Sequence, residues 1–312
     1  MEAVKTWQPT GGAPFYDSPM PRFALPPAAV PAEITRPPPF QIVSPSAQPP
    51  EGEGWLHEVK HDGHRLLAIV GGDDVKLISR NGHDRTALFR VPFDKLATAG
   101  LPPLVLDGEI AVPDERGVTH IDLLSEALRQ RRPESLAYFA FDLLHLDGHD
   151  LRPCAVEDRK ALLRDVIGSA GASRIVVVDS MTGGGAQLFA AVRQLGAEGV
   201  VSKRAGSAYR GGPGRDWLKT KVSETAAFVI TGYIEREAVA VAELGDGHLV
   251  PAGLVKFGLA GRDLWPQLAR LRAGPANRAG IVPVRPELVA GVKHFGRYRS
   301  GAIRDGVLLS VG

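Results

Sequence analysis

The sequence predicts an α+β chain in which antiparallel sheets with flanking helices are followed by a small closed β-barrel. Short apolar runs between Gly and Asp turns begin at Trp55 and are typical of strands. Runs with helical periodicity separate some of them, as expected for helices that cover a sheet. After Val222, five closely spaced strand candidates are interrupted by one helix near 263–272, a pattern that suits a barrel such as the OB-fold. We therefore expect domains over residues 23–222 and 226–312.

The first 50 residues are rich in proline and contain about half of the 25 prolines of the chain. Proline lacks a backbone N–H and has a fixed φ angle, so such a segment supports neither helices nor ladder pairing. We expect it to lie extended over the surface, with residues 1–22 as a flexible Pro-rich extension.

The remaining elements follow from apolar periodicity and from turn residues such as Gly71-Gly72-Asp73-Asp74 and Asp147-Gly148. Expected strands of the first domain are 55–60, 66–70, 75–79, 104–112, 138–145, 175–178, 200–203 and 217–221. Its expected helices are about 121–131, 156–168 and 185–195. Expected strands of the second domain are 228–233, 239–244, 249–257, 288–295 and 307–310, with a tight hairpin turn at Gly245-Asp246-Gly247.

Composition limits the function without identifying it. A chain of 312 residues with 44% hydrophobic content is long enough for two domains, each with its own core. A net charge of +2 permits a nucleic-acid partner but requires any basic surface to be local. The single cysteine, Cys154, excludes an intrachain disulfide and a thiolate zinc cage, and fits a reducing cytoplasm. No apolar run approaches the ~20 residues of a membrane span, and no secretory signal begins the chain.

The segment Glu58-Val59-Lys60-His61-Asp62-Gly63-His64-Arg65 is the most informative motif. A lysine, an acid, a glycine and an arginine follow directly after an apolar strand-like run. Such a set suits the formation of a bond from a lysine nitrogen to a nucleotide phosphate. The lysine is the nucleophile, the glycine permits a tight turn, and the flanking charges orient a polyphosphate.

Five further clusters accompany this motif. They are Ser79-Arg80-Asn81-Gly82, Asp107-Gly108-Glu109, Phe139-Ala140-Phe141-Asp142, Glu198 to Lys203, and Trp217 to Lys221. Taken singly, each has a structural explanation: Lys219 and Lys221 as a solvated strand face, Phe141 as core, Glu109 and Glu198 as surface acids. Together they supply what adenylyl transfer needs, which is a nucleophilic lysine, cations for phosphates, acids for a divalent metal and an aromatic face for the base.

In this order the motifs resemble those of the covalent nucleotidyltransferases, which comprise ATP-dependent DNA ligases, RNA ligases and mRNA capping enzymes. The finer resemblance is to the ligase module of bacterial end-joining ligases, and it runs from about residue 22 to 300. Three details carry it: Ser-Arg-Asn-Gly followed by Asp84, Thr86 and Phe89; Ala140 to Leu144 followed by Asp147-Gly148; and Ser207, Tyr209, Arg210 and Arg215 before Trp217-Leu218-Lys219. The resemblance implies an adenylyltransferase domain with ATP-grasp-like antiparallel sheets, followed by an OB-fold domain.

The resemblance also implies a role for each matching residue. Lys60 takes AMP from ATP, and Asp62 orients Lys60. Glu58 and Phe141 hold the adenine. Arg65 and Arg80 contact the ribose, the phosphates and later the nick. Glu109 and Glu198 bind either the ribose hydroxyls or a metal ion, Mg²⁺ or Mn²⁺. Lys219 and Lys221, with the metal, are expected to favour the neutral form of Lys60, because a free lysine with a pKa of about 10.4 is protonated at neutral pH.

The implied substrate is nicked double-stranded DNA, contacted mainly through its phosphates because a ligase joins any sequence. We expect a monomeric, cytoplasmic bacterial protein associated with the nucleoid and with no membrane contact. Because no polymerase or nuclease domain fits within this length, a minimal ligase of this kind is expected to use a separate end-holding partner such as Ku, or to serve excision repair.

Two departures keep alternatives open. Arg85 stands where relatives carry a tryptophan, and Arg304-Asp305-Gly306 lacks the arginine-histidine-proline that closes the C-terminal motif of relatives. The alternatives are an RNA ligase or capping-type nucleotidyltransferase, and a catalytically impaired DNA-end-binding protein. A zinc site at His57, His61 and His64 is disfavoured, because no further ligand is spaced to complete it.

Overall fold

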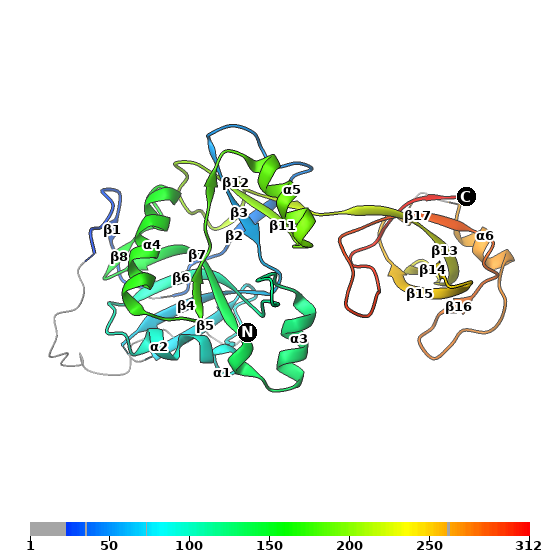
Figure 1. Cartoon of the computed structure of the whole chain (residues 1–312), viewed down its shortest axis with the longest axis horizontal. Helices are drawn as coiled ribbons and strands as arrows, with labels where there is room; N and C mark the ends of the chain where they lie inside the picture. The colour runs from blue at the N-terminus through cyan, green and yellow to red at the C-terminus, as the bar shows by residue number, and fades with distance from the viewer. Residues whose placement is uncertain (1–22, 35, 73, 261–262) are drawn as a thin grey trace. The chain divides into compact units, whose positions relative to one another are not determined.

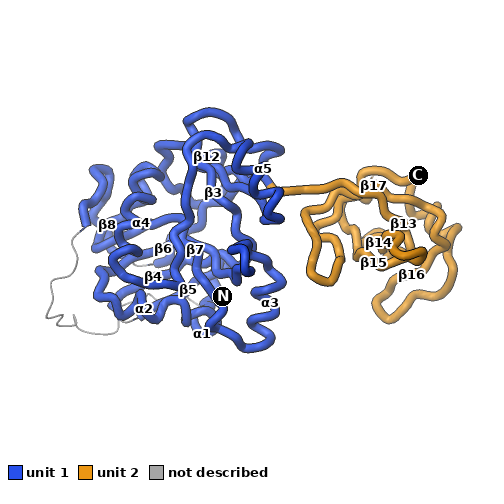
Figure 2. Tube along the Cα trace, viewed as in Figure 1, with its two compact units in different colours: residues 1–220 blue, residues 221–312 orange. Residues whose placement is uncertain are grey.

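The computed structural model describes residues 23–34, 36–72, 74–260 and 263–312. The predicted flexible extension over residues 1–22 lies outside these residues. Packing divides the chain into two compact units, residues 1–220 and residues 221–312 (Figure 2).

The larger sheet of the first unit has seven strands, most of them antiparallel (Figure 1). Its order is β1-β8-β7-β6-β4-β5, and β9 pairs with β7 in parallel. The strands are β1 (Val30–Pro31), β4 (His64–Gly71), β5 (Asp74–Ser79), β6 (Leu104–Ala111), β7 (Ala137–Leu146), β8 (His149–Asp150) and β9 (Ile175–Val177).

The second sheet of this unit has five strands in the order β10-β3-β11-β12-β2. They are β2 (Gln41–Pro45), β3 (Trp55–Lys60), β10 (Met181–Thr182), β11 (Gly199–Arg204) and β12 (Gly212–Lys221). Antiparallel pairing of β3 with β11 sets Lys60 opposite Gly199 and Glu58 opposite Val201. The Lys60 motif therefore lies beside the cluster that begins at Glu198.

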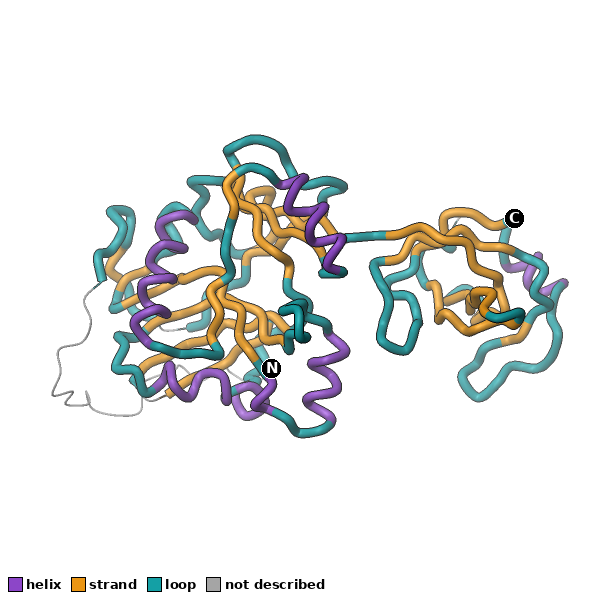
Figure 3. The backbone as a smooth tube through the Cα atoms, in the orientation of Figure 1, coloured by secondary structure: helices purple, strands orange, loops and turns teal. Residues whose placement is uncertain are grey.

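Helices lie on the outside of the strand layers in the first unit (Figure 3). They are α1 (Thr86–Phe89), α2 (Asp94–Ala97), α3 (Ile121–Arg129), α4 (Val156–Ala170) and α5 (Gly185–Leu195), with 3-10 turns at Val91–Phe93 and Pro133–Ser135. The three helices predicted from periodicity are confirmed as α3, α4 and α5, whereas the short α1 and α2 were not predicted. Among the described residues, no helix is both long and apolar enough to cross a membrane.

The two larger apolar clusters of the first unit pack against the seven-stranded sheet. The larger lies between one face of the seven-stranded sheet and helices that include α4, and it contains Leu66, Leu106, Tyr138 and Leu163. The smaller joins the two sheets and contains Leu67, Val105 and Leu144 from one sheet, with Phe40, Tyr209 and Trp217 from the segments around the other. The second cluster matters for function, because it holds the two sheets face to face.

The prediction that the Pro-rich segment forms no paired strand is wrong at two places. Val30–Pro31 form β1, which pairs with β8 at the edge of the seven-stranded sheet. Gln41–Pro45 form β2, which pairs in parallel with β12 at the edge of the five-stranded sheet. An edge position tolerates a nearby proline because one side of the strand needs no hydrogen-bond donors. Phe40 and Gln41 are buried, and the Gln41 side chain accepts a hydrogen bond from the Arg210 backbone N–H.

The second unit is a β-sheet with one short helix. Its strand order is β15-β14-β13-β17-β18, and β16 also pairs with β13. The elements are β13 (Glu224–Ile234), β14 (Ala238–Gly245), β15 (His248–Val255), α6 (Trp265–Arg270), β16 (Val282–Pro283), β17 (Val289–His294) and β18 (Val307–Val311). A bridge between Phe257, just after β15, and Val307 of β18 brings the two edges of this sheet together.

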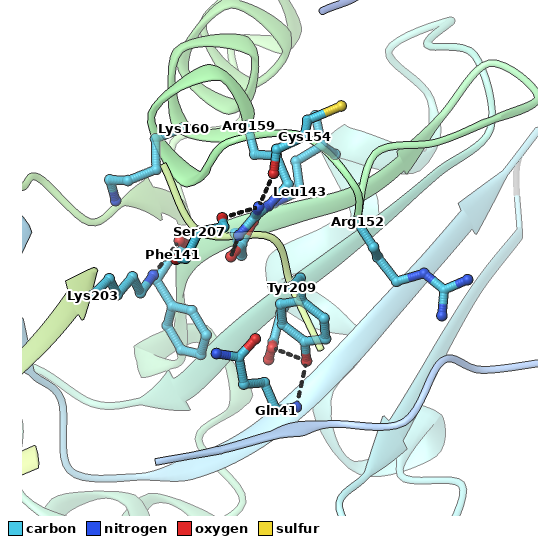
Figure 4. Close-up of polar contacts among 12 residues, drawn as sticks. Gln41, Phe141, Leu143, Arg152, Cys154, Arg159, Lys160, Lys203, Ser207 and Tyr209 are labelled. Atoms are coloured by element: carbon cyan, nitrogen blue, oxygen red, sulfur yellow. Dashed lines mark hydrogen bonds and ion pairs between the residues drawn. The ribbon is translucent and has the colours of Figure 1, made fainter. Parts of the chain in front are cut away.

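A buried ion pair anchors α4 to β7. Arg159 donates two hydrogen bonds to Asp142, of 2.7 and 2.8 Å, and both side chains are fully buried. Burial raises the pKa of Asp142, but the charge and hydrogen bonds of Arg159 outweigh it, and the net pKa is lowered. Arg159 also donates to the backbone carbonyls of Cys154 and Ser207 (Figure 4).

Replacing Arg159 with methionine is expected to lower the free energy of unfolding by about 3–5 kcal/mol, because Asp142 loses its partner inside the protein. Denaturant unfolding followed by circular dichroism measures this loss. Arg164→Met on the same helix is the matched control, since Arg164 lies 3.8 Å from the exposed Asp179 and such surface pairs contribute about 0–1 kcal/mol. Equal losses of unfolding free energy in both variants would show that the buried pair contributes no more to stability than the surface pair.

Candidate active site

The lysine motif crosses from one sheet to the other. Lys60 ends β3 in the five-stranded sheet, and His64 begins β4 in the seven-stranded sheet, so that only three residues span the junction. A Cβ atom at Gly63 would collide with the backbone carbonyl of Ile110. The glycine is thus required for the close approach of two strands, rather than for the tight turn that the sequence suggested. This crossing places Lys60 where the two sheets meet.

A cavity of about 500 Å³, including its open mouth, lies between the sheets at this point. Five predicted site residues line it: Glu58, Lys60, Arg65, Glu109 and Phe141. Its other lining residues are Val43, Val59, His61, Val201, Lys203 and Trp217. Residues from both sheets therefore form its walls, which explains why motifs far apart in sequence converge here.

An ion pair between Lys60 and Glu198 lies at one side of this cavity. The Nζ atom of Lys60 is 2.5 Å from Oε2 of Glu198, and the Glu198 side chain is only 6% exposed. Burial lowers the pKa of Lys60, but the charges of Glu198 and Glu109 outweigh it and the net pKa is raised. The two glutamates thus oppose the neutral form that the sequence analysis predicted for Lys60 with a metal bound, and that prediction stays a prediction.

Glu109 faces the same lysine from β6. Burial raises its pKa to about 8, against the opposing effects of Lys60 and Arg65. A carboxyl group in this environment gains from a further cation, and a divalent metal fits on that ground. Among the described residues, no group of three or more His, Cys, Asp or Glu side chains forms a metal site alone. A metal at Glu109 and Glu198 would take its other ligands from phosphate oxygens and water, as Mg²⁺ usually does beside nucleotides.

Arg65 is fixed by an acid that was not assigned to the site from the sequence. It donates to both oxygens of Asp107, at 2.9 and 2.6 Å, and to the backbone carbonyl of Gln41. The hydroxyl of Tyr209 donates to the same carboxylate at 2.7 Å. Asp107 lies two residues before Glu109 on β6, so strand alternation turns both acids to the same face. The spacing of two residues was therefore the signal in the sequence that could have assigned Asp107 to the site.

An aromatic wall completes the cavity. The rings of Phe141 and Trp217 lie 6.0 Å apart in an edge-on arrangement. The guanidinium carbon of Arg65 is 5.3 Å from the centre of the Phe141 ring, and Nζ of Lys203 is 4.2 Å from that of Trp217. Trp217 and Lys203 were noted in the motifs but not assigned to the site. Because Arg65 and Lys203 already place positive charge against the rings, the wall suits a flat base that is neutral rather than positively charged.

Asp62 fixes the position of the segment 61–63, which links the two sheets. Its carboxylate accepts a hydrogen bond from the backbone N–H of Ile121, the first residue of α3, and its own N–H donates to Thr119. Its negative charge also contributes to the raised pKa of Lys60. Asp62 therefore ties the segment after Lys60 to the start of a helix and acts on the lysine through charge.

Arg80 lies in a second cavity, of about 950 Å³ including its open mouth. Arg65 lines both cavities, and Arg85, the residue that departs from the relatives, lines the second. His64 and His83 also line it, and none of its lining residues in the described part of the chain is Asp or Glu. This basic cavity suits an anion such as a phosphate group.

Lys219 and Lys221 line neither of these two cavities. Both lie on β12, and Nζ of Lys221 is 3.5 Å from Asp305. The predicted effect of these two lysines on the charge of Lys60 therefore has no support from their placement.

The three histidines of the motif do not converge on one point. His57 contacts the Ser202 hydroxyl at 2.8 Å through Nδ1, and its ring packs against Gly185 of α5. The ring of His61 stacks on Phe139 with 4.0 Å between centres. His64 lines the second cavity. Each ring thus has a separate structural environment.

Residues 41–221 match the sequence model of a family described as "ATP dependent DNA ligase domain". A protein of Pseudomonas aeruginosa named "Multifunctional non-homologous end joining protein LigD" is 34% identical over 289 residues, which cover 86% of this chain and 34% of the relative. A "Multifunctional non-homologous end joining DNA repair protein LigD" of Mycobacterium tuberculosis is 37% identical over 80% of this chain and 35% of its own length. This chain thus spans about a third of the length of these curated relatives.

Solved structures give the same family. The structure described as "mycobacterial DNA ligase D complexed with ATP and MES" has 31% identity and a TM-score of 0.56, covering 88% of this chain and 94% of the other. The ligase domain of M. tuberculosis LigD has 32% identity and a TM-score of 0.54, covering 88% and 93%. The likeness spans most of the chain and supports a nucleotidyltransferase-type ligase fold.

Stability should depend on the protonation of His61. Burial, with the charge of Lys60, lowers its pKa from 6.5 to about 4. Below pH 6.5 the unfolded chain therefore binds more protons than the folded one, and stability falls by up to about 1.4 kcal/mol per pH unit until about pH 4. Denaturant unfolding at pH 7, 6 and 5 measures the loss. His61→Phe, which keeps a ring against Phe139, should lose less over this range; parallel curves for both proteins would contradict the assignment.

Proposed function

The chain belongs to the family of ATP-dependent DNA ligases, and from that premise we propose that it seals nicks in double-stranded DNA through AMP bound covalently to Lys60. The observation that carries this proposal is the position of Lys60, between two carboxylates at the edge of a cavity with an aromatic wall. The family match selects a DNA ligase over the RNA ligase and capping-type alternatives.

In the first step, Nζ of Lys60 attacks the α-phosphate of ATP, a P–N bond forms and pyrophosphate leaves. An ammonium group has no free electron pair, so Nζ must lose a proton and its ion pair with Glu198 must loosen before the attack. Loss of the attraction to Glu198 would lower the pKa of Lys60, because that attraction raises it. A divalent cation, Mg²⁺ or Mn²⁺, held by Glu109 and Glu198 would neutralise charge on the phosphate oxygens.

The base is proposed to stack on Phe141 and to meet Glu58 at the inner end of the cavity. Both residues line this cavity, and Glu58 lies two residues before Lys60 on β3. Residues two apart on a strand point to the same side, so one face of β3 contacts the base and the reacting phosphate. The solved relative described as a complex with ATP supports ATP as the nucleotide.

In the second step, AMP passes from Lys60 to the 5′-phosphate at the nick. In the third, the 3′-hydroxyl attacks that phosphate, AMP leaves and the strand is joined. The second cavity supports a role for Arg80 and Arg65 at the DNA phosphate, because it is basic and shares Arg65 with the nucleotide cavity. Arg85 adds a further cation to the same cavity.

We assign the first unit to an adenylyltransferase domain and the second to an OB-fold domain that contacts DNA. The bridge between Phe257 and Val307, which joins the edges of the second sheet, supports a closed barrel. Asp305, from the atypical C-terminal motif, lies against Lys221. Both lysines of β12, Lys219 and Lys221, are proposed to act on the nucleotide phosphates when the two domains engage a substrate.

The cellular role proposed here is DNA repair in the bacterial cytoplasm. The curated relatives are named for non-homologous end joining, which supports a role at broken DNA ends. A Ku-type end-binding partner and action as a monomer are part of the proposal.

Lys60→Ala is expected to abolish the first step, because the amine of Lys203, which also lines the cavity, is held by Glu58 and by the Phe141 carbonyl. Intact-protein mass spectrometry after incubation with ATP and Mn²⁺ should show one added AMP on the unaltered protein and none on the variant. Lys95→Ala, on the exposed face of α2, is the control and should carry AMP. An unmodified wild type that still binds nicked DNA would favour the alternative of an impaired end-binding protein.

Nick binding should weaken steeply with salt, because phosphate contacts release counterions from the DNA. The slope of log affinity against log salt concentration, measured by fluorescence anisotropy with a nicked duplex, is expected to fall by about one unit in Arg80→Ala. Arg164→Ala, on the far helix α4, should leave the slope unchanged. An affinity that does not respond to salt would count against a groove that follows the phosphate backbone.

A further inference from the structure

Two buried lysines lie around Glu58, and the ligase chemistry above uses neither of them. Nζ of Lys160 is 2.6 Å from Oε1 of Glu58, and Nζ of Lys203 is 2.9 Å from Oε2. All three side chains are 1–3% exposed. A buried Lys–Glu–Lys group of this kind is expensive to maintain, since each charge loses its hydration. That cost suggests a use for the charges.

The lysines are held from two different elements. Lys160 comes from the middle of α4, and its Nζ donates to the backbone carbonyl of Val178 at 2.8 Å. Lys203 comes from β11 and donates to the carbonyl of Phe141 at 2.8 Å (Figure 4). Their positions are therefore fixed independently of any ligand, and so is the position of the carboxylate between them.

Glu58 keeps hydrogen-bonding capacity toward the cavity. It lines the cavity, and each of its oxygens contacts one lysine, Oε1 at 2.6 Å from Lys160 and Oε2 at 2.9 Å from Lys203, so that each oxygen keeps a second lone pair. A carboxylate accepts hydrogen bonds and donates none.

We propose that Lys160, with Lys203, holds the carboxylate of Glu58 in place as an acceptor for the amino group at the 6-position of the purine base, which makes Lys160 a positioning residue for base selection. The inference rests on the proposed function, because it concerns the base of the nucleotide that reacts with Lys60. Lys160 acts through Glu58 and does not touch the base. Hydrogen bonds to a carboxylate are stronger than those to a neutral acceptor, so the selection depends on a carboxylate that is held in one orientation.

Lys160 is needed beside Lys203 because each lysine holds a different oxygen of Glu58. Lys203 also donates a hydrogen bond to the Phe141 carbonyl. Removal of Lys160 leaves Oε1 without its ion-pair partner, so that the carboxylate is held at Oε2 alone.

The test compares ATP with purine riboside triphosphate, which lacks only the 6-amino group. Transfer of labelled nucleotide to Lys60 gives kcat/KM for each. The wild type is expected to prefer ATP by roughly tenfold to a hundredfold, the usual value of one hydrogen bond to a charged group. Lys160→Met should lower this ratio by about fivefold or more, whereas Lys160→Arg, which keeps the charge, should retain most of it.

A double-mutant cycle separates selection from folding. In a Glu58→Gln background the acceptor is neutral, so adding Lys160→Met should leave the ratio unchanged. If Lys160→Met slows both nucleotides equally, with the ratio intact, Lys160 only supports the fold and the inference is overturned. If Lys160→Met does not accumulate as folded protein, judged by thermal unfolding, Lys160→Gln removes the charge while keeping donors, and the same drop in ratio is required of it.

The same assay keeps the two proposals apart. A wild type that takes no label from ATP would overturn the proposed function itself. A wild type that takes label from ATP, with a ratio that does not respond to Lys160, would overturn only the role of Lys160.

Discussion

The ion pair between Lys60 and Glu198 is the contact on which the site depends, because it joins the end of β3 to the start of β11 and places the nucleophile in the gap between two sheets. The two residues are 138 positions apart in sequence. Their contact favours the charged form of the lysine, since the charge of Glu198 raises the pKa of Lys60. A charged lysine has no free electron pair with which to attack a phosphate. In the proposed reaction, a triphosphate with a divalent metal would engage Glu198 and weaken its attraction for Lys60.

The gap between the sheets is stable because its acids are matched with cations. Asp107 is paired with Arg65, Asp142 with Arg159, and Glu58 with two lysines. Buried charges of this kind are costly alone and tolerable in pairs. Glu109 differs, because its pKa is raised to about 8 although Lys60 and Arg65 lie near it. The pKa of Glu109 is therefore raised close to neutral pH beside Lys60, and a further cation bound there would favour its ionised form. The apolar cluster between the sheets lowers the dielectric constant around these charges, and the interactions between them are therefore stronger.

Local structure was predictable from the sequence, whereas contacts between distant segments were not. α4 was predicted within two residues because its apolar positions recur with helical spacing. β2 was missed because the surrounding prolines dominate the local pattern, and its pairing with β12 depends on residues about 170 positions away. The sequence placed a lysine, acids and an aromatic residue in one chain, but the raised pKa of Lys60 arises from a distance that no motif contains. Lys160 carried no signal at all, since a lysine on a helix is usually solvated. The same holds for Tyr209, whose hydroxyl fixes Asp107 only in the folded chain.

The two cavities divide the chemistry between them. The first combines the nucleophile with carboxylates and an aromatic wall, and the second contains arginines and histidines without an acid among its described lining residues. They share Arg65, whose guanidinium is held in place by Asp107. An anion in the second cavity would therefore be attracted by a cation that also lines the first cavity. In the proposed reaction the adenylylated lysine must next meet a 5′-phosphate. An arginine that is shared by both cavities and held by two hydrogen bonds to Asp107 would reduce the cost of orienting these two groups.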